Sequence, residues 1–249
     1  MIEDYRSAQR AGQRAYRANV ARGQSPYLAV LDDILTDVDI VAQEPLGLVD
    51  IPAESIVGTK TAGRHTAFAS NFMPLLDDDT EFAVKWSNLC DAHLEEGIHT
   101  PIIAFEYLNK FYVQEGNKRV SVLKYVNAYS VPAYVTRLLP RRSKEADNRL
   151  YYAFLDFYQV SFNCDVWFSR EESYSRLLKA MGMKPGQVWD QDQRMYFKGA
   201  HDLFVQIFEG KRTPDIEMTA SDAFLVYVEI FGYSQVKEKT GDQMRRDLD

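Results

Sequence analysis

Cysteine is scarce in this sequence: Cys90 and Cys164 are the only two among 249 residues. They stand in unrelated surroundings, and no spacing of cysteine and histidine matches a zinc site. A disulfide framework is excluded as the basis of the fold, because domains built that way need several bridges. We therefore expect a reducing, cytoplasmic setting and a protein that uses neither zinc nor haem.

Long apolar runs and an excess of positive charge are also absent. No stretch approaches the roughly 18 apolar residues of a membrane-spanning helix, and the first residues are polar. Lys and Arg number 29 against 36 Asp and Glu, which gives a net charge of −7. A chain of this charge does not coat nucleic acid, so contact with DNA would need a local basic patch. We expect no membrane partner and do not favour DNA as a partner.

The sequence does have enough apolar material for folded domains, since 46% of its residues are hydrophobic and 13% aromatic. Residues 1–43 are predicted to form a helical arm, along which arginines recur at helical spacing. A second basic group follows residue 136. The two groups are Arg6, Arg10, Arg14 and Arg17, and Arg137, Arg141, Arg142 and Lys144. Such groups could touch a polyanion or an acidic partner, but solvated faces are the simpler interpretation.

Residues 44–140 alternate irregularly between β-like and helical segments, which predicts an α+β domain with a small mixed sheet. Strands are expected at 46–51, 102–107, 111–114 and 131–138, and helices at 67–76, 80–96 and 117–126. The basic, proline-containing segment 140–144 is the predicted boundary. Residues 141–249 are predicted to form a mostly helical carboxy-terminal domain.

The most informative segment is a β run that ends in a glycine turn and continues directly into an amphipathic helix. The turn reads Glu115-Gly116-Asn117-Lys118-Arg119. The first N–H groups of a helix have no internal partner and the helix dipole is positive there, so a glycine lets a phosphate approach the main chain closely. Lys118 and Arg119 add positive charge, and a guanidinium suits bidentate contact with phosphate. The turn predicts a phosphate site, although a solvated helix start is the simpler alternative.

The order of features over about residues 44–140 resembles the ParB/sulfiredoxin-like superfamily. The strand from Leu46 to Pro52 leads to a loop that ends in Arg64, as the first ParB motif ends in an arginine. The stretch Gly97-Ile98-His99-Thr100-Pro101-Ile102-Ile103 is similar to the start of the family's second strand. Gly116 to Arg119 corresponds to the family's Gly-x-x-Arg phosphate motif, and a last strand begins at Ser130.

This chain departs from the family pattern at positions that distinguish the branches of the family from one another. Sulfiredoxin has a catalytic cysteine after the glycine of the turn, whereas this chain has Asn117, so repair of cysteine sulfinate is not expected. The helix-turn-helix and the further nucleotide motif of chromosome-partitioning ParB proteins have no convincing counterpart after Arg141. A branch of kinases that act on free serine has an acid before the glycine, where this chain has Glu115.

The resemblance implies a bacterial, ParB-like regulatory module that binds a nucleotide or other phosphate ligand and acts as a ligand-responsive switch. The implied ligand is a nucleoside triphosphate, CTP or ATP, with Mg²⁺ as an accompanying ion. Its phosphates would bind at Gly116, Asn117, Lys118 and Arg119, and Arg64 with Lys60 would close over them.

Two other interpretations stay open. A Mg²⁺-dependent phosphotransferase or nuclease of this fold would use Glu115 as the metal ligand or the base. A non-catalytic interaction module of a transport-associated or DNA-associated bacterial protein would instead use its carboxy-terminal helices to bind a partner protein or a second copy of the chain. The sequence also resembles, more loosely, bacterial chains that carry a basic-membrane-protein-type binding domain.

Overall fold

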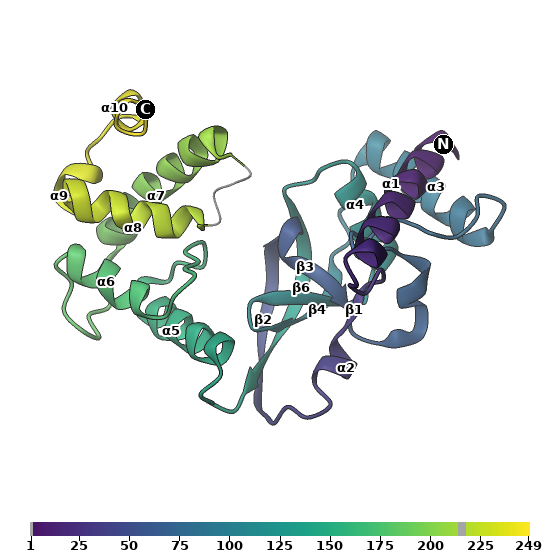
Figure 1. Ribbon diagram of the computed structural model, residues 1–249, viewed down its shortest axis with the longest axis horizontal. Helices are drawn as coiled ribbons and strands as arrows, with labels where there is room; N and C mark the ends of the chain where they lie inside the picture. Colours follow the sequence, from purple (N-terminus) through teal and green to yellow (C-terminus); the bar gives the residue numbers. More distant parts are fainter. Residues whose placement is uncertain (1, 214–217) are drawn as a thin grey trace. The chain divides into compact units, whose positions relative to one another are not determined.

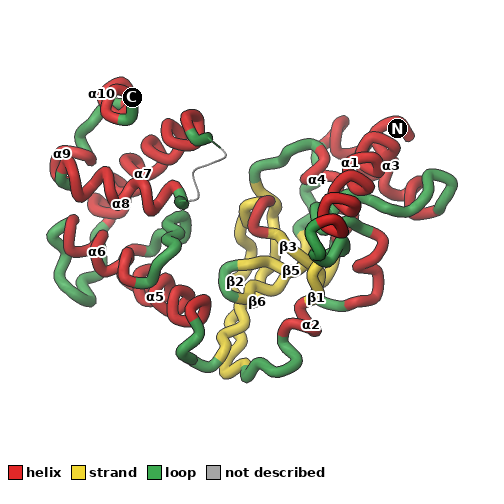
Figure 2. Tube along the Cα trace, viewed as in Figure 1, coloured by secondary structure: helices red, strands yellow, loops and turns green. Residues whose placement is uncertain are grey.

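A computed structural model describes residues 2–213 and 218–249, and the chain divides into two compact units, residues 1–141 and 142–249 (Figure 1). The first unit contains a sheet with helices, and the second is helical (Figure 2). A mixed sheet with flanking helices is the α+β class predicted from the sequence, which is confirmed. In the described ranges, no helix is both long and apolar enough to cross a membrane.

The first unit is built on six strands. They are β1 (Ala29–Val30), β2 (Ile40–Pro52), β3 (Ile56–Thr59), β4 (Ile102–Tyr107), β5 (Lys110–Glu115) and β6 (Ser130–Pro140). Its α-helices are α1 (Ile2–Ala21), α2 (Leu31–Ile34), α3 (Glu81–Glu96) and α4 (Asn117–Tyr125), and two 3-10 helices are η1 (Ala53–Ser55) and η2 (Ala62–Ala67). The amino-terminal arm thus belongs to the same compact unit as the sheet.

The strand order is β1-β3-β5-β4-β6-β2. β3 is parallel to both β1 and β5, and β4 is parallel to β6. The hairpin of β4 with β5 and the long pair of β2 with β6 are antiparallel. Because β3 and β5 run in the same direction, with Thr59 opposite Val113, both strands end at the same edge of the sheet. The helix α4 starts directly after β5, so its amino terminus lies at that edge.

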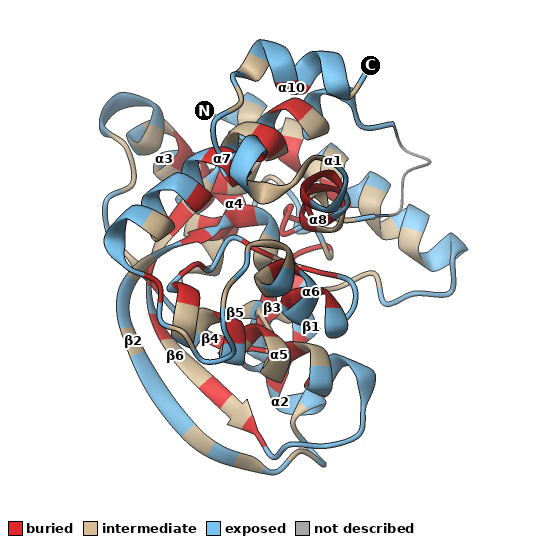
Figure 3. Cartoon of the chain, turned by 90° about the vertical axis from the view of Figure 1, so that its left-hand side faces the viewer, coloured by how far each residue is buried: buried red, intermediate tan, exposed pale blue. Residues whose placement is uncertain are grey.

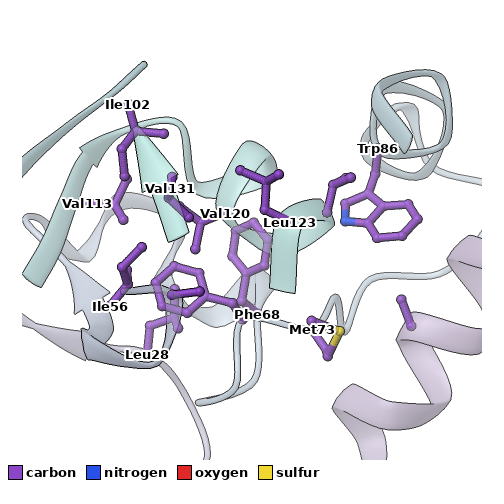
Figure 4. Close-up of a cluster of buried hydrophobic side chains, with 14 of the residues drawn as sticks. Leu28, Ile56, Phe68, Met73, Trp86, Ile102, Val113, Val120, Leu123 and Val131 are labelled. Carbon is purple, nitrogen blue, oxygen red and sulfur yellow. The ribbon is translucent and has the colours of Figure 1, made fainter. Parts of the chain in front are cut away.

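The main core lies on one face of the sheet, where α1, α3 and α4 pack (Figure 4). Trp86 of α3 is fully buried there, and its Nε1 donates a hydrogen bond to Ser121 Oγ of α4 at 2.8 Å. On the other face, Tyr107 and Tyr112 are buried in a smaller cluster with Leu31 of α2. The two tyrosines therefore contribute to the packing of that face of the sheet.

The helix predicted over residues 67–76 is wrong. Only Ala67 belongs to a helix, as the last residue of η2, and the chain that follows is irregular. Phe72 has a φ of 66° and Pro74 has no N–H to donate, so neither residue can continue an α-helix. Phe68 and Phe72 are both buried in the main core, so apolar spacing there reflects burial of a loop.

The helix α1 is attached to the irregular segment 71–78 by close contact. The Tyr5 hydroxyl donates to Leu76 O at 2.7 Å, and Arg6 of the basic stripe pairs with Asp78 at 2.6 Å. A Cβ on Gly12 would lie 2.5 Å from Pro74 O, so only glycine allows this approach. One arginine of the amino-terminal basic group, Arg6, therefore forms an ion pair within the first unit.

The second unit consists of helices around an aromatic core. They are α5 (Ala146–Ser161), α6 (Glu172–Ala180), α7 (Gln191–Lys211), α8 (Ala220–Phe231), α9 (Tyr233–Val236) and α10 (Gly241–Asp247). Capping boxes begin α7 at Asp190 and α8 at Thr219, which fixes both starts. Phe224, Leu225 and Val228 are buried on one side of α8, whereas Ile230 is 68% exposed. α8 is thus a core helix with one exposed side. Figure 3 shows the chain coloured by burial.

His201 of α7 is buried in the aromatic core of the second unit. Its ring stacks on Phe197 and meets Phe224 edge-on, and Nε2 lies 3.3 Å from Ser221 Oγ. Nδ1 is buried, with no hydrogen-bond partner in the described structure. Burial lowers the pKa of His201 below its ordinary value of 6.5, and Lys198 acts in the same direction, whereas Asp202 and Asp165 oppose the shift. The folded unit therefore holds this imidazole neutral.

We expect the second unit to lose stability as the pH falls below about 6.5. In that range the His201 side chain of the unfolded chain binds a proton, whereas the buried His201 side chain of the folded chain does not. This contribution is complete above that pH and declines by up to ~1.4 kcal/mol per pH unit until the lowered pKa is reached. Denaturant melts of the full chain between pH 8 and pH 5, at roughly one-unit steps, measure it. His201→Phe should flatten the profile, and His99→Gln, at an exposed histidine, should leave it unchanged. Equal profiles for wild type and His201→Phe would contradict the assignment.

Candidate phosphate-binding site

The turn from β5 into α4 is shaped by Gly116. This residue has a φ of 110°, and a Cβ on it would lie 2.7 Å from Ile102 Cγ2. Val120 N donates to Gly116 O at 3.0 Å, which closes the first turn of the helix. The N–H groups of Asn117, Lys118 and Arg119 lie in that first turn, where the helix offers them no acceptor. The backbone here can accept an anion at the positive end of the helix dipole.

Asn117 fixes the start of α4 against the end of β3. Its Nδ2 donates to Thr59 Oγ1 at 3.2 Å, and the Thr59 hydroxyl in turn donates to Val113 O at 3.1 Å. The Asn117 Oδ1 atom is buried, with no hydrogen-bond partner in the described structure. Asn117 therefore links the helix start to two strands.

Lys118 and Arg64 lie within electrostatic reach of each other. The Lys118 ammonium lies 4.5 Å from the centre of the Phe82 ring of α3. Burial lowers the pKa of Lys118, and the positive charges of Lys85 and Arg64 lower it further, whereas Glu81 opposes them. Arg64 comes from η2 and is exposed, with no ion pair in residues 2–213 or 218–249. Two positive side chains and one negative side chain thus act on the Lys118 ammonium.

Two residues that sequence reasoning missed belong to this cluster. Glu81 and Lys85 of α3 form an ion pair at 2.6 Å, and both are well exposed. Their spacing of four residues, directly after the Thr80 cap of α3, is the signal that could have identified them. Because Glu81 is already paired with Lys85, it offsets only part of the charge of Lys118 and Arg64.

Arg119 is engaged by the protein itself. Its guanidinium donates to Thr100 O at 3.0 Å, to Pro101 O, and to Glu115 Oε1 at 3.1 Å, and its side chain is only 15% exposed. In this structure Arg119 therefore holds the residues that lead into β4. Glu115 is 68% exposed at the rim of the turn.

The described residues contain no group of three or more His, Cys, Asp or Glu side chains arranged to hold a metal ion. Mg²⁺ commonly takes one or two carboxylates together with the phosphates of its substrate. Glu115 as a Mg²⁺ ligand or a base stays a prediction.

Lys60 points away from the turn. It follows Thr59 directly, and side chains alternate between the two faces along a strand. Thr59 contacts Asn117, whereas the Lys60 ammonium pairs with Asp32 and lies 5.4 Å from the centre of the Phe105 ring, in the cluster on the opposite face. The structure thus places Arg64 within electrostatic reach of Lys118, and it places the Lys60 ammonium on the opposite face of the sheet.

No known sequence family matches the chain, and no curated protein is significantly similar to it in sequence. Among solved structures, sulfiredoxin from Arabidopsis thaliana matches with 17% identity and a TM-score of 0.26, over 35% of this chain and 82% of that chain. The C-terminally truncated chromosome-partitioning protein ParB from Caulobacter crescentus matches with 12% identity and a TM-score of 0.27, over 82% of this chain and 99% of that chain. Sulfiredoxin and ParB are the proteins after which the superfamily that the sequence resembles is named.

Proposed function

We propose that this chain is a regulatory module that binds the phosphate groups of a nucleotide at the first turn of α4. The observation that carries the proposal is the positive charge of Arg64 and Lys85 that acts on Lys118, at the start of a helix whose first N–H groups have no helical acceptor after the Gly116 turn. Positive groups that crowd one another are each destabilised, and a bound phosphate relieves that repulsion. A bound anion therefore accepts backbone hydrogen bonds, and its negative charge offsets the repulsion between Lys118 and Arg64.

The same geometry gives the site a route to a conformational signal. Asn117 connects the first turn of α4 to Thr59 of β3, and Arg119 connects it to the residues before β4. A ligand that shifts this turn acts on both connections at once. If the shifted arrangement binds phosphate better than the resting one, the ligand changes their populations by that difference in affinity.

The proposal is tested by thermal melts with CTP, ATP, GTP, ADP and pyrophosphate, with and without Mg²⁺. CTP is the first candidate because the C. crescentus ParB named above is complexed with CTP-gamma-S. A ligand that binds only the folded state at 100 times its Kd stabilises it by about 2.7 kcal/mol, which gives a clear rise in Tm. We expect this rise to disappear in Arg64→Ala and in Lys118→Met.

Lys60→Ala is the matched control, since it removes a lysine from the opposite face and should keep the full response. Arg119→Ala is a poor probe, because it also releases the contacts with Thr100 and Pro101. A shift of equal size in wild type, Arg64→Ala and Lys118→Met would place the nucleotide elsewhere. The absence of any shift would favour the interaction-module interpretation.

The enzymatic alternative depends on the exposed carboxylate of Glu115 beside the proposed site. It predicts that a bound nucleotide is turned over in the presence of Mg²⁺ and that Glu115→Gln abolishes turnover while binding persists. Chromatography of the nucleotide after incubation with the protein separates the two cases. If the nucleotide is recovered intact after incubation with the protein at a saturating nucleotide concentration, the enzymatic alternative is excluded and the regulatory role is retained.

A further inference from the structure

A cavity of about 410 Å³, lined mainly by polar residues, lies at the opposite end of α4 from the proposed phosphate site. It is formed where α1, the segment 71–73 and the end of α4 meet. Its polar lining residues are Ser7, Arg14, Asn71, Lys124, Tyr125 and Asn127. This volume is within the range of sites for small organic molecules.

The wall of the cavity is fixed by the docking of α1. Ala11 and Met73 line the cavity, and Gly12 between them in space touches the backbone at Met73 and Pro74 so closely that a Cβ would not fit. Gln9 adds a hydrogen bond from Nε2 to Leu76 O at 2.7 Å. The wall is therefore preformed, and a ligand would not need to create it.

Lys124 is a cation held in a mostly buried position. Its Nζ donates one hydrogen bond, to Ile56 O at 2.9 Å, and lies 5.2 Å from the centre of the Phe72 ring. Burial lowers the pKa of Lys124 to about 8, and Glu54 acts weakly in the opposite direction. An ammonium has three donors, so two remain for a ligand.

Arg14 brings a second cation to the cavity from α1, where it is one of the exposed arginines of the stripe. Asn71 accepts a hydrogen bond from Met73 N through Oδ1, which leaves its amide N–H groups as donors. The described lining residues include two cations and no carboxylate. Two acids act on lining residues from outside the cavity: Asp4 accepts a hydrogen bond from the Tyr125 hydroxyl at 3.1 Å, and the charge of Glu54 acts on Lys124.

We propose that this cavity binds a small organic anion, a carboxylate or a phosphate monoester, between Arg14 and Lys124. The anion supplies the negative charge that the lining lacks, and the amide N–H groups of Asn71 supply neutral donors to it. The arginine is suited to the flat, bidentate face of a carboxylate or phosphate, whereas the ammonium acts as a point charge. This site is independent of the proposed nucleotide site, since none of its lining residues belongs to the cluster around Arg64 and Lys118.

Titration of the full chain with malonate and with inorganic phosphate, against chloride at equal ionic strength, tests this proposal. We expect one or both anions to raise the Tm, and isothermal titration to give a Kd about tenfold weaker in Arg14→Gln. Arg10→Gln removes the preceding arginine of the stripe, which does not line the cavity, and should bind as wild type does. Arg64→Ala should also keep the response, which separates this site from the nucleotide site.

A second measurement covers the case in which Lys124→Met fails to fold. Reductive ¹³C-methylation of the wild-type lysines makes the Lys124 amine visible by NMR, and a bound anion should move its titration to higher pH, because a negative neighbour favours the ammonium. No response to either anion at tens of millimolar would overturn the proposal. So would a response that is equal in wild type, Arg10→Gln and Arg14→Gln.

Discussion

Gly116→Ala is expected to lower the free energy of unfolding of the first unit by roughly 2–4 kcal/mol. The residue has a φ of 110°, which costs any side-chain-bearing residue conformational energy. The new methyl group would also lie 2.7 Å from Ile102 Cγ2 and 3.1 Å from Arg119 Nε, so the turn or β4 must move. Denaturant melts followed by circular dichroism measure the loss, and the nucleotide-induced rise in Tm should disappear with it.

Gly23→Ala is the matched control for this substitution. Gly23 also has a positive φ, of 68°, but a Cβ there meets no atom within 4 Å. The alanine therefore pays only the conformational cost of a positive φ, and we expect the free energy of unfolding to fall by about 1 kcal/mol. If both alanine variants lose the same stability, the close approach of Gly116 to Ile102 makes no contribution to the stability of the first unit.

Arg137→Met is expected to cost about 3–5 kcal/mol of stability, which is the usual result of removing one member of a buried ion pair. Arg137 Nε lies 2.6 Å from Glu106 Oε2, and the side chains are 13% and 2% exposed. Glu106 Oε1 also accepts from Asn109 N at 2.7 Å, so the carboxylate is fixed in place at the end of β4. Without the guanidinium, its charge stays buried with less compensation. The free energy of unfolding from denaturant melts of the full chain is the measurement.

Arg141→Met provides the comparison, because Arg141 pairs with Asp39 at the surface. The two side chains are 72% and 59% exposed, and solvated pairs of this kind contribute about 0–1 kcal/mol. The two arginines belong to one basic group in the sequence, and they differ in burial and in the carboxylate with which each one pairs. Similar losses for both variants would show that Arg137 stabilises the sheet through packing of its aliphatic chain and not through Glu106.

Much of the sheet could be predicted from the sequence because its longer strands carry a local apolar signal. The strand predicted over 102–107 is found as β4, and those over 111–114 and 131–138 lie within β5 and β6. β1 has two residues and β3 has four, with a glycine in the middle, so neither is long enough to show a periodicity. These short strands exist because β5 pairs with β3 and β3 in turn pairs with β1, which no local pattern reveals.

Some residues of the proposed site could likewise be predicted from local sequence patterns, whereas others are brought there only by tertiary packing. Gly116 and the helix start at Asn117 are local features, and the sequence places them correctly. Lys60 and Arg64 are close in sequence, but the alternation after Thr59 sends Lys60 to the opposite face. Lys85 joins Lys118 only through the packing of α3 on α4, which is a contact between distant parts of the chain.

The guanidinium of Arg119 closes the corner before β4, because it donates to the carbonyl groups of Thr100 and Pro101. If the phosphate of the proposed ligand recruits this guanidinium, it must take it from those carbonyls, which then need water or another donor. In that case binding of the ligand would release the backbone between Thr100 and Ile102 from its attachment to the start of α4.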